Sequence, residues 1–261
     1  MVALRILEPK GGSPRDFVDK SVDSNFGGHP LENHEARYSS IQVIVVALNE
    51  EQGIGPTIAE LKDTLDSPRI LVVDGHSSDK TVEIAKSLGV DIAFQDGVGK
   101  GDAISRALKL TSPNAEYVVI TDADFTYPAK HVPGMIKILE QDPDVGMVCG
   151  NRFGSQLDNK TLDSRFFLGN KLLAFAHSIL NGITLHDPLT GLRVIRTELL
   201  KNWAMKSGSF DVEVELNSLV RRKGYKTIEV PIQYRQRLGE KKLKMKHGAI
   251  ILKRIMTETD F

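Results

Sequence analysis

Short apolar runs alternate with segments of helical periodicity from Ile41 onward, and this alternation limits the fold more than any other feature of the chain. The apolar runs predict strands at residues 41–47, 70–73, 90–94, 117–121 and 145–149. The intervening segments predict helices at residues 55–65, 79–88, 101–110 and 131–140. Strands that alternate with helices of this length form a mostly parallel sheet with helices on both faces. The sequence therefore predicts an α/β fold.

The second half of the chain is less regular. Residues 165–180 predict a long amphipathic helix with apolar Phe166, Phe167, Leu172, Leu173, Ala176 and Leu180. Further elements are expected as a strand at 192–195, a helix at 212–222 and a strand at 225–231. We expect one domain over residues 40–243, followed by a basic amphipathic helix at 244–261. Residues 1–39, with scattered Gly, Pro and charges, predict a loosely ordered extension or an arm that packs on the domain or a partner.

The chain has one cysteine, Cys149, which excludes an intrachain disulfide and favours a reducing cytoplasm. No apolar stretch reaches the roughly 18 residues of a transmembrane helix, so none is expected. The first residues lack the apolar core of a signal peptide. We therefore expect a cytoplasmic protein.

Charge is balanced overall but distributed unevenly. The 34 Lys and Arg match 34 Asp and Glu, so no net field attracts nucleic acid. From Arg221 to Arg254, however, twelve basic residues face only Glu229 and Glu240, a local net charge of +10. Such a segment favours anions, either phosphate groups or a membrane surface.

Two carboxylates follow the predicted strand at 117–121. Asp122 and Asp124 flank Ala123, and in an extended chain this spacing puts both side chains on one face. Two such oxygens can hold Mg²⁺ or Mn²⁺ while leaving positions open for substrate phosphates. Acidic pairs also occur at ordinary strand ends, so this pair alone leaves metal binding open.

Two more polar clusters follow predicted parallel strands, Asn49–Glu51 and Asp74–Asp79. Ligands of such sheets bind at the carboxyl ends of the strands, so we expect these clusters to lie close to the acidic pair. Asp74 can accept hydrogen bonds from a base or a ribose. Asp79 either contributes to the same site or only caps the following helix.

Two glycine-containing turns also carry polar groups. Gly97–Gly101 opens a predicted helix and contains Lys100, which either reaches a diphosphate or is a solvated lysine in a flexible loop. Asp187–Arg193 is a tight turn into a strand. Asp187 there can orient an acceptor, a sugar hydroxyl or Arg193, or can simply cap the turn.

Later polar residues leave the same choice between ligand binding and structure. Asp211 and Glu215 share one face of a predicted helix, where they bind a ligand or stabilise the helix N-terminus. The basic loop at residues 235–243 suits phosphate, or is a solvated tail. The histidines without metal-ligand spacing are taken as structural or surface residues: His76, His131, His177 and His186.

The order of these motifs resembles family 2 glycosyltransferases, most closely the dolichol-phosphate mannose and glucose synthases. The resemblance covers residues 41–243. The segments that carry it are Ala47–Glu51, Val73–Asp79, Gly99–Gly101, Asp122–Pro128, Gly150–Phe153, Asp187–Arg193, Glu229–Ile232 and the basic loop. Each motif is weak alone, but the ordered set is specific.

The resemblance implies the GT-A fold, a nucleotide-diphospho-sugar donor and a divalent metal, Mg²⁺ or Mn²⁺. By motif match it assigns Ala47, Leu48, Glu50 and Asp74 to the nucleoside, Asp122, Ala123 and Asp124 to the metal and diphosphate, Lys100, Arg237 and Lys242 to donor phosphates, and Arg152 and Arg165 to the acceptor phosphate. Of these, we predict Asp122, Asp124, Arg152 and Arg165 as catalytic.

Three positions depart from the family pattern. Thr126 stands where many relatives have Gln, which leaves the metal or donor contact of that position open. Lys241 replaces a common Ser, and Leu48 stands where a Pro often precedes the Asn-Glu pair. Some relatives also carry transmembrane helices, which we do not expect here.

We therefore predict inverting, metal-dependent transfer of a hexose, from GDP-mannose or UDP-glucose, to a polyprenyl or dolichyl phosphate. An anionic phosphate acceptor needs no general base, whereas a hydroxyl acceptor would require one, and Asp187 is then the candidate. The C-terminal helix predicts a peripheral contact with the cytoplasmic face of a membrane. Alternatively it packs on the domain or forms an oligomer contact, which makes a homodimer possible.

Three alternatives stay open at this point. A glycosyltransferase that acts on a soluble or glycan hydroxyl would keep the same donor site. A sugar-1-phosphate nucleotidyltransferase would show a Gly-rich, basic segment where this chain has Asn49–Glu51. A non-catalytic binding module would function without Asp122 and Asp124.

Overall fold

The computed structural model describes residues 40–65, 68–154, 164–242 and 246–258, with the backbone alone at 164–166 and 246. The predicted extension at residues 1–39 lies outside the described residues. Within them, seven strands form one sheet: β1 (Ile41–Ala47), β2 (Arg69–Asp74), β3 (Asp91–Phe94), β4 (Tyr117–Asp122), β5 (Val145–Asn151), β6 (Arg193–Arg196) and β7 (Lys226–Pro231).

The sheet is mostly parallel, as the sequence predicts. Its strand order is β3-β2-β1-β4-β6-β5-β7. Strands β1, β2, β3 and β4 pair in parallel, and so do β5 and β7, whereas β6 runs antiparallel to both β4 and β5. The apolar run that predicts β6 carries no information on direction, so its reversal was not predicted.

The predicted helices are present with small shifts of their ends. The helices are α2 (Ile54–Leu65), α3 (Thr81–Ser87), α4 (Lys100–Leu110), α5 (Val132–Gln141), α6 (Ser164–Asn181), α7 (Thr197–Leu200), α8 (Val212–Arg222), α9 (Lys246–Thr257) and the 3₁₀ helix η1 (Ala129–His131). The short α7 and η1 were not predicted, because one turn of helix has no measurable periodicity.

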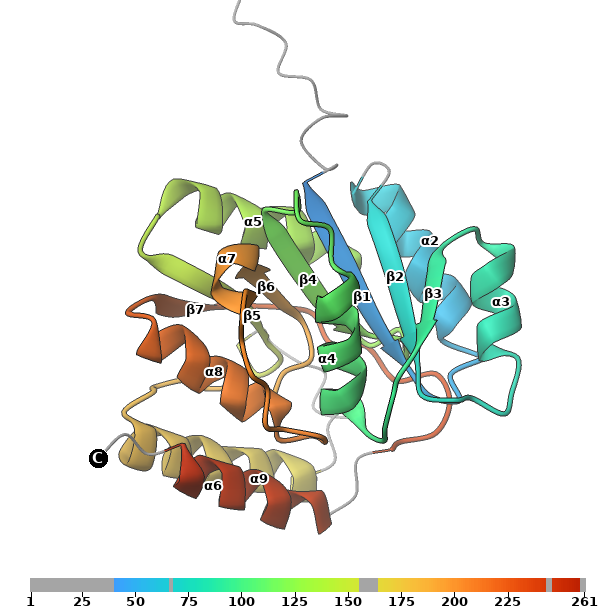
Figure 1. The fold of residues 1–261 in the computed structure, drawn as a ribbon. Helices are drawn as coiled ribbons and strands as arrows, with labels where there is room; N and C mark the ends of the chain where they lie inside the picture. The colour runs from blue at the N-terminus through green and yellow to red at the C-terminus, as the bar shows by residue number, and fades with distance from the viewer. Residues whose placement is uncertain (1–39, 66–67, 155–163, 243–245, 259–261) are drawn as a thin grey trace, which may run out of the picture. The chain divides into compact units, whose positions relative to one another are not determined.

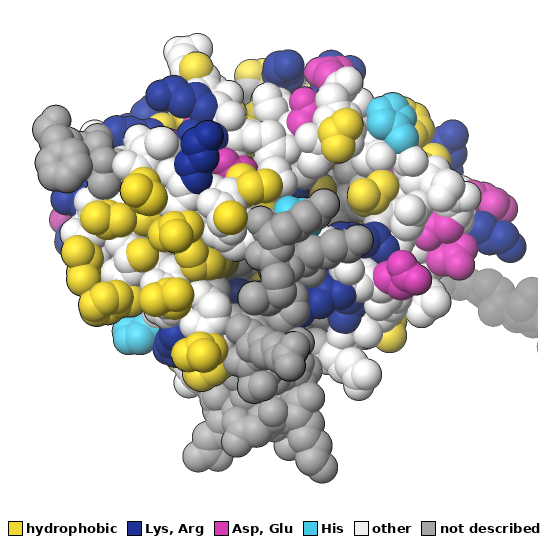
Figure 2. All heavy atoms as spheres, turned by 90° about the horizontal axis from the view of Figure 1, so that it is seen from below, with side chains coloured by type: hydrophobic (Ala, Val, Ile, Leu, Met, Phe, Trp, Pro, Cys, Tyr) yellow, Lys and Arg dark blue, Asp and Glu magenta, His cyan; other side chains and the backbone are white. Residues whose placement is uncertain are grey.

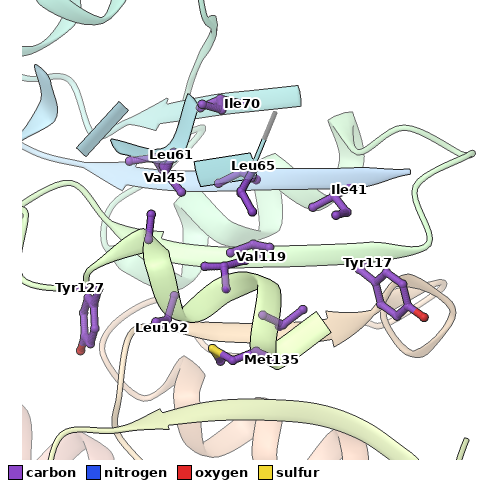
Figure 3. Packing of buried hydrophobic residues seen from close by; sticks show 14 of the residues in the cluster. Ile41, Val45, Leu61, Leu65, Ile70, Tyr117, Val119, Tyr127, Met135 and Leu192 are labelled. Carbon is purple, nitrogen blue, oxygen red and sulfur yellow. The ribbon is translucent and has the colours of Figure 1, made fainter. Parts of the chain in front are cut away.

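Alternate residues of the central strands pack into two apolar clusters on opposite faces of the sheet. Val45 and Val119 belong to the cluster under α2, α3 and α5, where Met135 also lies (Figure 3). Ile44 and Ile120 belong to the cluster under α4, α7 and α8. Each such fully buried side chain contributes roughly 1.5–3 kcal/mol. These two clusters fix the strand ends that carry the polar motifs.

Helices α6 and α9 lie side by side next to α8 (Figure 1). Ile251 and Ile255 of α9 pack with Val214 of α8 and with Leu173 of α6. Leu172, by contrast, is 66% exposed, so α6 is apolar on both faces rather than amphipathic as predicted. Among the described helices, none combines the length and apolar character that crossing a bilayer requires.

Candidate active site

The three predicted polar clusters meet at one edge of the sheet. In the register, β1 pairs Ala47 with Asp74 of β2 and Val46 with Asp122 of β4. The contact between β1 and β2 extends one residue past the end of β2, because the Gly75 amide donates to the Ala47 carbonyl at 2.8 Å. The prediction that these strand ends lie together is confirmed.

Each of these three strands is followed by a residue in the left-handed region. The φ angles are 49° at Asn49, 63° at His76 and 64° at Phe125. Non-glycine residues there cost roughly 1–2 kcal/mol each, and the surrounding contacts must hold them. Asn49 is held by its amide donating to Ser77 Oγ at 2.7 Å and its Oδ1 accepting from the Ser78 amide at 2.8 Å. This concentration of strain at one edge is typical of a functional site.

Lys100 bridges two carboxylates at the first turn of α4. Its Nζ lies 2.7 Å from Asp122 Oδ1 and 2.8 Å from Glu213 Oε1, and only 9% of its side chain is exposed. Burial alone would lower the pKa of Lys100, but the charges of Asp122 and Glu213 raise it well above its usual value. Lys100 is therefore a fixed positive charge beside the acidic pair.

Arg237 is the second cation at this edge. Its Nη1 lies 2.7 Å from Asp124 Oδ2, and its Nη2 pairs with Glu50 Oε1. The other oxygen of Asp124, Oδ1, accepts from the amide and hydroxyl of Thr126 at 3.1 and 2.6 Å. Thr126, the departure from the family pattern, thus holds Asp124 in place.

The backbone around the acidic pair leaves no room for larger residues. A Cβ added to Gly191 would lie 2.4 Å from Asp122 Oδ2. A Cβ added to Gly53 would lie 2.5 Å from the Ala123 carbonyl oxygen. The Gly191 amide also donates to Tyr127 Oη at 2.8 Å, which fixes the turn against the acidic pair.

The two carboxylates at this edge pair with cations of the protein, and they differ in exposure. The Asp122 side chain is 29% exposed, whereas that of Asp124 is 5% exposed and has both oxygens bonded within the protein. The described residues hold no group of three or more His, Cys, Asp and Glu side chains arranged for a metal. A site with one or two carboxylates is the kind that Mg²⁺ uses when substrate phosphates supply its other ligands. Asp122 is the accessible member of the pair.

The residues assigned to the nucleoside surround the same edge with unequal exposure. Asp74 is fully buried, and its two oxygens accept from the Ser77 amide at 2.7 Å and Ser77 Oγ at 2.6 Å. Ala47 is also buried, whereas Leu48 is 41% exposed. Lys242 Nζ donates to the Asn49 carbonyl at 3.1 Å. Asp74 shapes the turn in this structure, and its nucleoside contact stays a prediction.

Arg152 forms a buried fork with Asp187. Its Nε and Nη2 each donate to Asp187 at 2.7 Å, and its amide donates at 3.0 Å. Asp187 is 0% exposed, and its own amide donates to Glu229 Oε1 at 2.7 Å. Both Asp187 oxygens accept hydrogen bonds from Arg152, and the role of Asp187 as a general base stays a prediction. Arg165, the second residue predicted to hold the acceptor phosphate, lies on α6 with its side chain outside the described residues.

Breaking the fork is expected to destabilise the protein. Asp187→Asn leaves the buried Arg152 guanidinium without its counter-charge, so we expect a loss of about 3 kcal/mol in the free energy of unfolding. Urea unfolding measures this loss. The matched control is Asp144→Asn, which removes an ion pair to Lys226 that is exposed on both sides and should leave stability nearly unchanged. Equal effects of the two substitutions would contradict the structural role of the fork.

Three carboxylates lie at the start of α8: Asp211, which precedes the helix, and Glu213 and Glu215 in its first turn. Asp211 pairs with Arg254 at 2.9 Å, and Glu215 accepts from the amides of Lys206 and Ser207 at 2.8 and 2.7 Å. Both predicted candidates are thus used by protein groups. Glu213, which the sequence analysis missed, is the one that reaches Lys100. In the sequence, Glu213 is an acidic residue in the first turn of a helix. Such a residue is also found where it only stabilises the helix macrodipole, so the sequence does not distinguish the two roles.

Glu50 carries a perturbed charge. Burial raises its pKa to about 7, and the charges of Asp124 and Asp122 add to this effect against those of Arg237 and Lys242. A carboxyl with a higher pKa when folded binds more protons in the folded state between pH 4.5 and 7. The free energy of unfolding must therefore fall as pH rises through this window.

This shift predicts a pH-dependent effect of Glu50→Gln. The free energy of unfolding of the variant minus that of wild type should rise by about 2 kcal/mol from pH 5 to pH 8. The reason is that wild type acquires a buried negative charge at residue 50 over this range, whereas the variant does not. Thermal unfolding in EDTA at both pH values measures the gain. Glu51→Gln, at the exposed neighbouring side chain, controls for the loss of one charge. A gain that is the same at both pH values would contradict the raised pKa.

The comparison with known proteins agrees with this geometry. The model of the family described as Glycosyl transferase family 2 matches residues 42–203. The chain is 35% identical to a dolichyl-phosphate hexose transferase of Haloferax volcanii over 80% of this chain and 89% of that protein. It is also 29% identical to glycosyltransferase AglJ of the same organism, over 75% of this chain and 63% of that protein.

Solved structures show the same fold. Glucosyl-3-phosphoglycerate synthase from Mycobacterium tuberculosis, in complex with Mn²⁺, UDP-glucose and phosphoglyceric acid, has a TM-score of 0.66 at 20% identity. The match covers 90% of this chain and 85% of that one. At this identity the likeness concerns the fold, and it confirms the predicted GT-A architecture. With the family match over more than half of the sequence, the chain is a glycosyltransferase and belongs to glycosyl transferase family 2.

Proposed function

We propose that this enzyme transfers a hexose from a nucleotide-diphospho-sugar, GDP-mannose or UDP-glucose, to a polyprenyl phosphate such as dolichyl phosphate, with inversion at the anomeric carbon. The observation that carries the proposal is the convergence of Lys100 and Arg237 on the acidic pair Asp122 and Asp124. The acceptor is supported by the function in the name of the 35% identical relative from Haloferax volcanii.

The donor half of the proposal follows from charge. A leaving nucleoside diphosphate develops negative charge, and fixed cations placed beforehand stabilise it. Lys100 keeps its proton because Asp122 and Glu213 raise its pKa, and Arg237 is the second cation that contacts the acidic pair. Asp122 and Asp124 would hold Mg²⁺ or Mn²⁺, which supplies Lewis-acid neutralisation of the diphosphate.

The acceptor half follows from the state of Asp187. A hydroxyl acceptor must lose a proton, whereas a phosphate monoester is already anionic near neutral pH and attacks without a base. Asp187 is fully buried and bonded to Arg152, so it is poorly placed to serve as that base. This arrangement supports a phosphate over a soluble or glycan hydroxyl. Family membership itself decides against the nucleotidyltransferase and the non-catalytic module.

A lipid acceptor also implies where the reaction takes place. We propose that the enzyme works as a peripheral protein at the cytoplasmic face of a membrane, where a polyprenyl phosphate presents its head group to the aqueous donor.

A homodimer stays a prediction. Light scattering of the purified chain with and without lipid tests it directly.

Transfer of label into an organic phase tests the proposed function. The chain is incubated with radiolabelled GDP-mannose or UDP-glucose, dolichyl phosphate and Mg²⁺ or Mn²⁺, then extracted with chloroform and methanol. We expect organic-phase label from one of the two donors, and its loss in EDTA. Donor consumption with label confined to the aqueous phase would overturn the lipid acceptor while keeping the glycosyltransferase.

A further inference from the structure

Arg193 is a buried arginine whose hydrogen-bond partners in the described part of the chain are all uncharged. It begins β6 and is 1% exposed. Its Nε donates to the Thr190 carbonyl at 3.0 Å, and its Nη2 donates to the Pro188 carbonyl at 2.6 Å. Its Nη1 donates to Asn217 Oδ1 of α8 at 2.6 Å. Burying a guanidinium without a carboxylate partner is costly, so stability alone does not explain this residue.

The two carbonyls that Arg193 holds belong to the turn at residues 187–191, which contacts both halves of the active site. Asp187, at the start of the turn, forms the fork with Arg152. Gly191, at its end, packs so closely on the acidic pair that an added Cβ would lie 2.4 Å from an Asp122 oxygen. The buried guanidinium therefore fixes the middle of a turn whose two ends contact the fork and the acidic pair.

From Asn217 the hydrogen bonds continue to the helix pair α6 and α9. Asn217 Nδ2 lies 3.2 Å from His177 Nε2, and it also donates to the Pro188 carbonyl at 3.1 Å. His177 Nδ1 lies 3.1 Å from Asn181 Oδ1, and Asn181 Nδ2 donates to the Ile255 carbonyl of α9 at 3.2 Å. The three side chains from α8 and α6 are at most 5% exposed. We call the following four residues the buried relay: Arg193, Asn217, His177 and Asn181.

The two ends of the buried relay determine the direction of every hydrogen bond in it. Arginine has no acceptor, so the oxygen of Asn217 must face Arg193 and its nitrogen must face His177. A carbonyl only accepts, so the nitrogen of Asn181 faces Ile255 and its oxygen faces His177. Both ends thus require His177 to carry its proton on Nδ1 and to accept at Nε2. Burial lowers the pKa of His177, which favours the neutral ring that this arrangement needs.

Helix α6 buries these polar groups although its outer side exposes large apolar ones. Leu172 and Phe175 are 66% and 63% exposed, and Figure 2 shows apolar side chains gathered over α6 and α9. His177 and Asn181, by contrast, lie on the side that packs on the domain. A buried polar network contributes little more to stability than apolar packing of the same volume. The position of the relay, behind the turn of the active site, points instead to a role in positioning that turn.

We propose that the buried relay positions the turn at residues 187–191 for sugar transfer, with Arg193 holding the turn and His177 orienting Asn217. The relay touches neither donor nor acceptor and acts through the fork, so its members are positioning residues. The proposal deepens the proposed function and rests on it for the identity of the acceptor. The proton on His177 can be observed without turnover, so the relay and the acceptor can fail independently.

Two-bond ¹H–¹⁵N spectra of the full chain at pH 7 test the relay without any substrate. The His177 signal is assigned by its loss in His177→Gln. We expect a neutral ring with its proton on Nδ1, because the two asparagines on either side allow only that form. A proton on Nε2, or a doubly protonated ring, would overturn the relay.

The kinetic test breaks the relay at His177, because Arg193→Met would leave two buried carbonyls without donors and endanger folding. His177→Leu removes the acceptor for Asn217, whereas His177→Gln keeps one, since an amide oxygen can accept in its place. We expect His177→Leu to raise KM for dolichyl phosphate about 10-fold, the effect of one buried donor left unpaired. His177→Gln should stay within about threefold of wild type.

The KM for the nucleotide-sugar separates positioning from general damage. It should stay within about twofold in His177→Leu, because Lys100 and Arg237 are held by contacts outside the relay. Gln42→Leu is the matched control for lost stability. Gln42 is 3% exposed and donates to the Arg69 carbonyl at 3.0 Å, at the end of the parallel strands opposite the active site. This variant should also lower the melting temperature, but it should leave both KM values unchanged.

Three kinetic outcomes would overturn the positioning role: an unchanged KM for dolichyl phosphate in His177→Leu, an equal rise in Gln42→Leu, or a rise in His177→Gln as large as in His177→Leu. If wild type makes no product from dolichyl phosphate, the proposed acceptor fails, and the backbone amide signals of residues 187–191 decide on the relay. His177→Leu should shift these signals and His177→Gln should leave them nearly in place. Signals that stay unshifted in His177→Leu would overturn the relay whatever the acceptor is.

Discussion

Asp122→Asn and Asp124→Asn are each expected to lower kcat/KM for sugar transfer by roughly 1,000-fold. Removing one charge from the pair weakens the hold on a divalent cation and leaves the leaving diphosphate less stabilised, and the loss of one such electrostatic contact typically costs 100- to 1,000-fold. Initial rates at varied Mn²⁺ measure the effect. Because Asp122 is the exposed member, excess Mn²⁺ should partly restore Asp122→Asn.

Asp91→Asn is the matched control for both substitutions. Asp91 begins β3 and is exposed at the opposite end of the parallel strands. Its substitution should leave kcat/KM within twofold of wild type. If Asp122→Asn or Asp124→Asn also stayed within that range, the acidic pair would not hold the donor.

Lys100→Met is expected to lower kcat by about 100-fold and the free energy of unfolding by about 3 kcal/mol. The first effect follows from the loss of a fixed cation beside the diphosphate. The second follows because Asp122 and the nearly buried Glu213 would face each other without a counter-charge. Steady-state kinetics and urea unfolding measure the two effects separately.

A second substitution separates charge from stability. Lys100→Met combined with Glu213→Gln removes the repulsion, so stability should largely return while kcat stays low. Lys109→Met, an exposed lysine on the same helix, should change neither. Recovery of kcat in the double variant would mean that Lys100 only stabilises the fold.

The sequence predicted the sheet edge well because its signals are local. Buried parallel strands are apolar runs followed by polar turns. The apolar run that ends at Asp122 and Asp124 can therefore be recognised in the sequence without knowledge of any distant contact. The position of the strand ends follows from the rule that parallel strands share a carboxyl edge. Ile41–Ala47, the first predicted strand, has the predicted ends.

Other features depend on contacts between residues that are distant in the sequence, and the sequence did not predict them. Glu213 meets Lys100 more than one hundred residues away, so its role appears only in the folded chain. Asp187 reads as an available carboxylate in the sequence, whereas Arg152 occupies it in the structure. The apolar residues on both faces of α6 read as an amphipathic pattern until the packed face is known. These misses share one cause, which is that spacing reveals a face but not what covers it.

The measurement that tests the central claim most directly compares dolichyl phosphate with dolichol as acceptor, using the donor that labels the organic phase. The account predicts metal-dependent product with dolichyl phosphate and none with dolichol, because only the phosphate attacks without a base. Product from dolichol, or equal product from both, would contradict transfer to a lipid phosphate at the edge formed by Asp122, Asp124, Lys100 and Arg237.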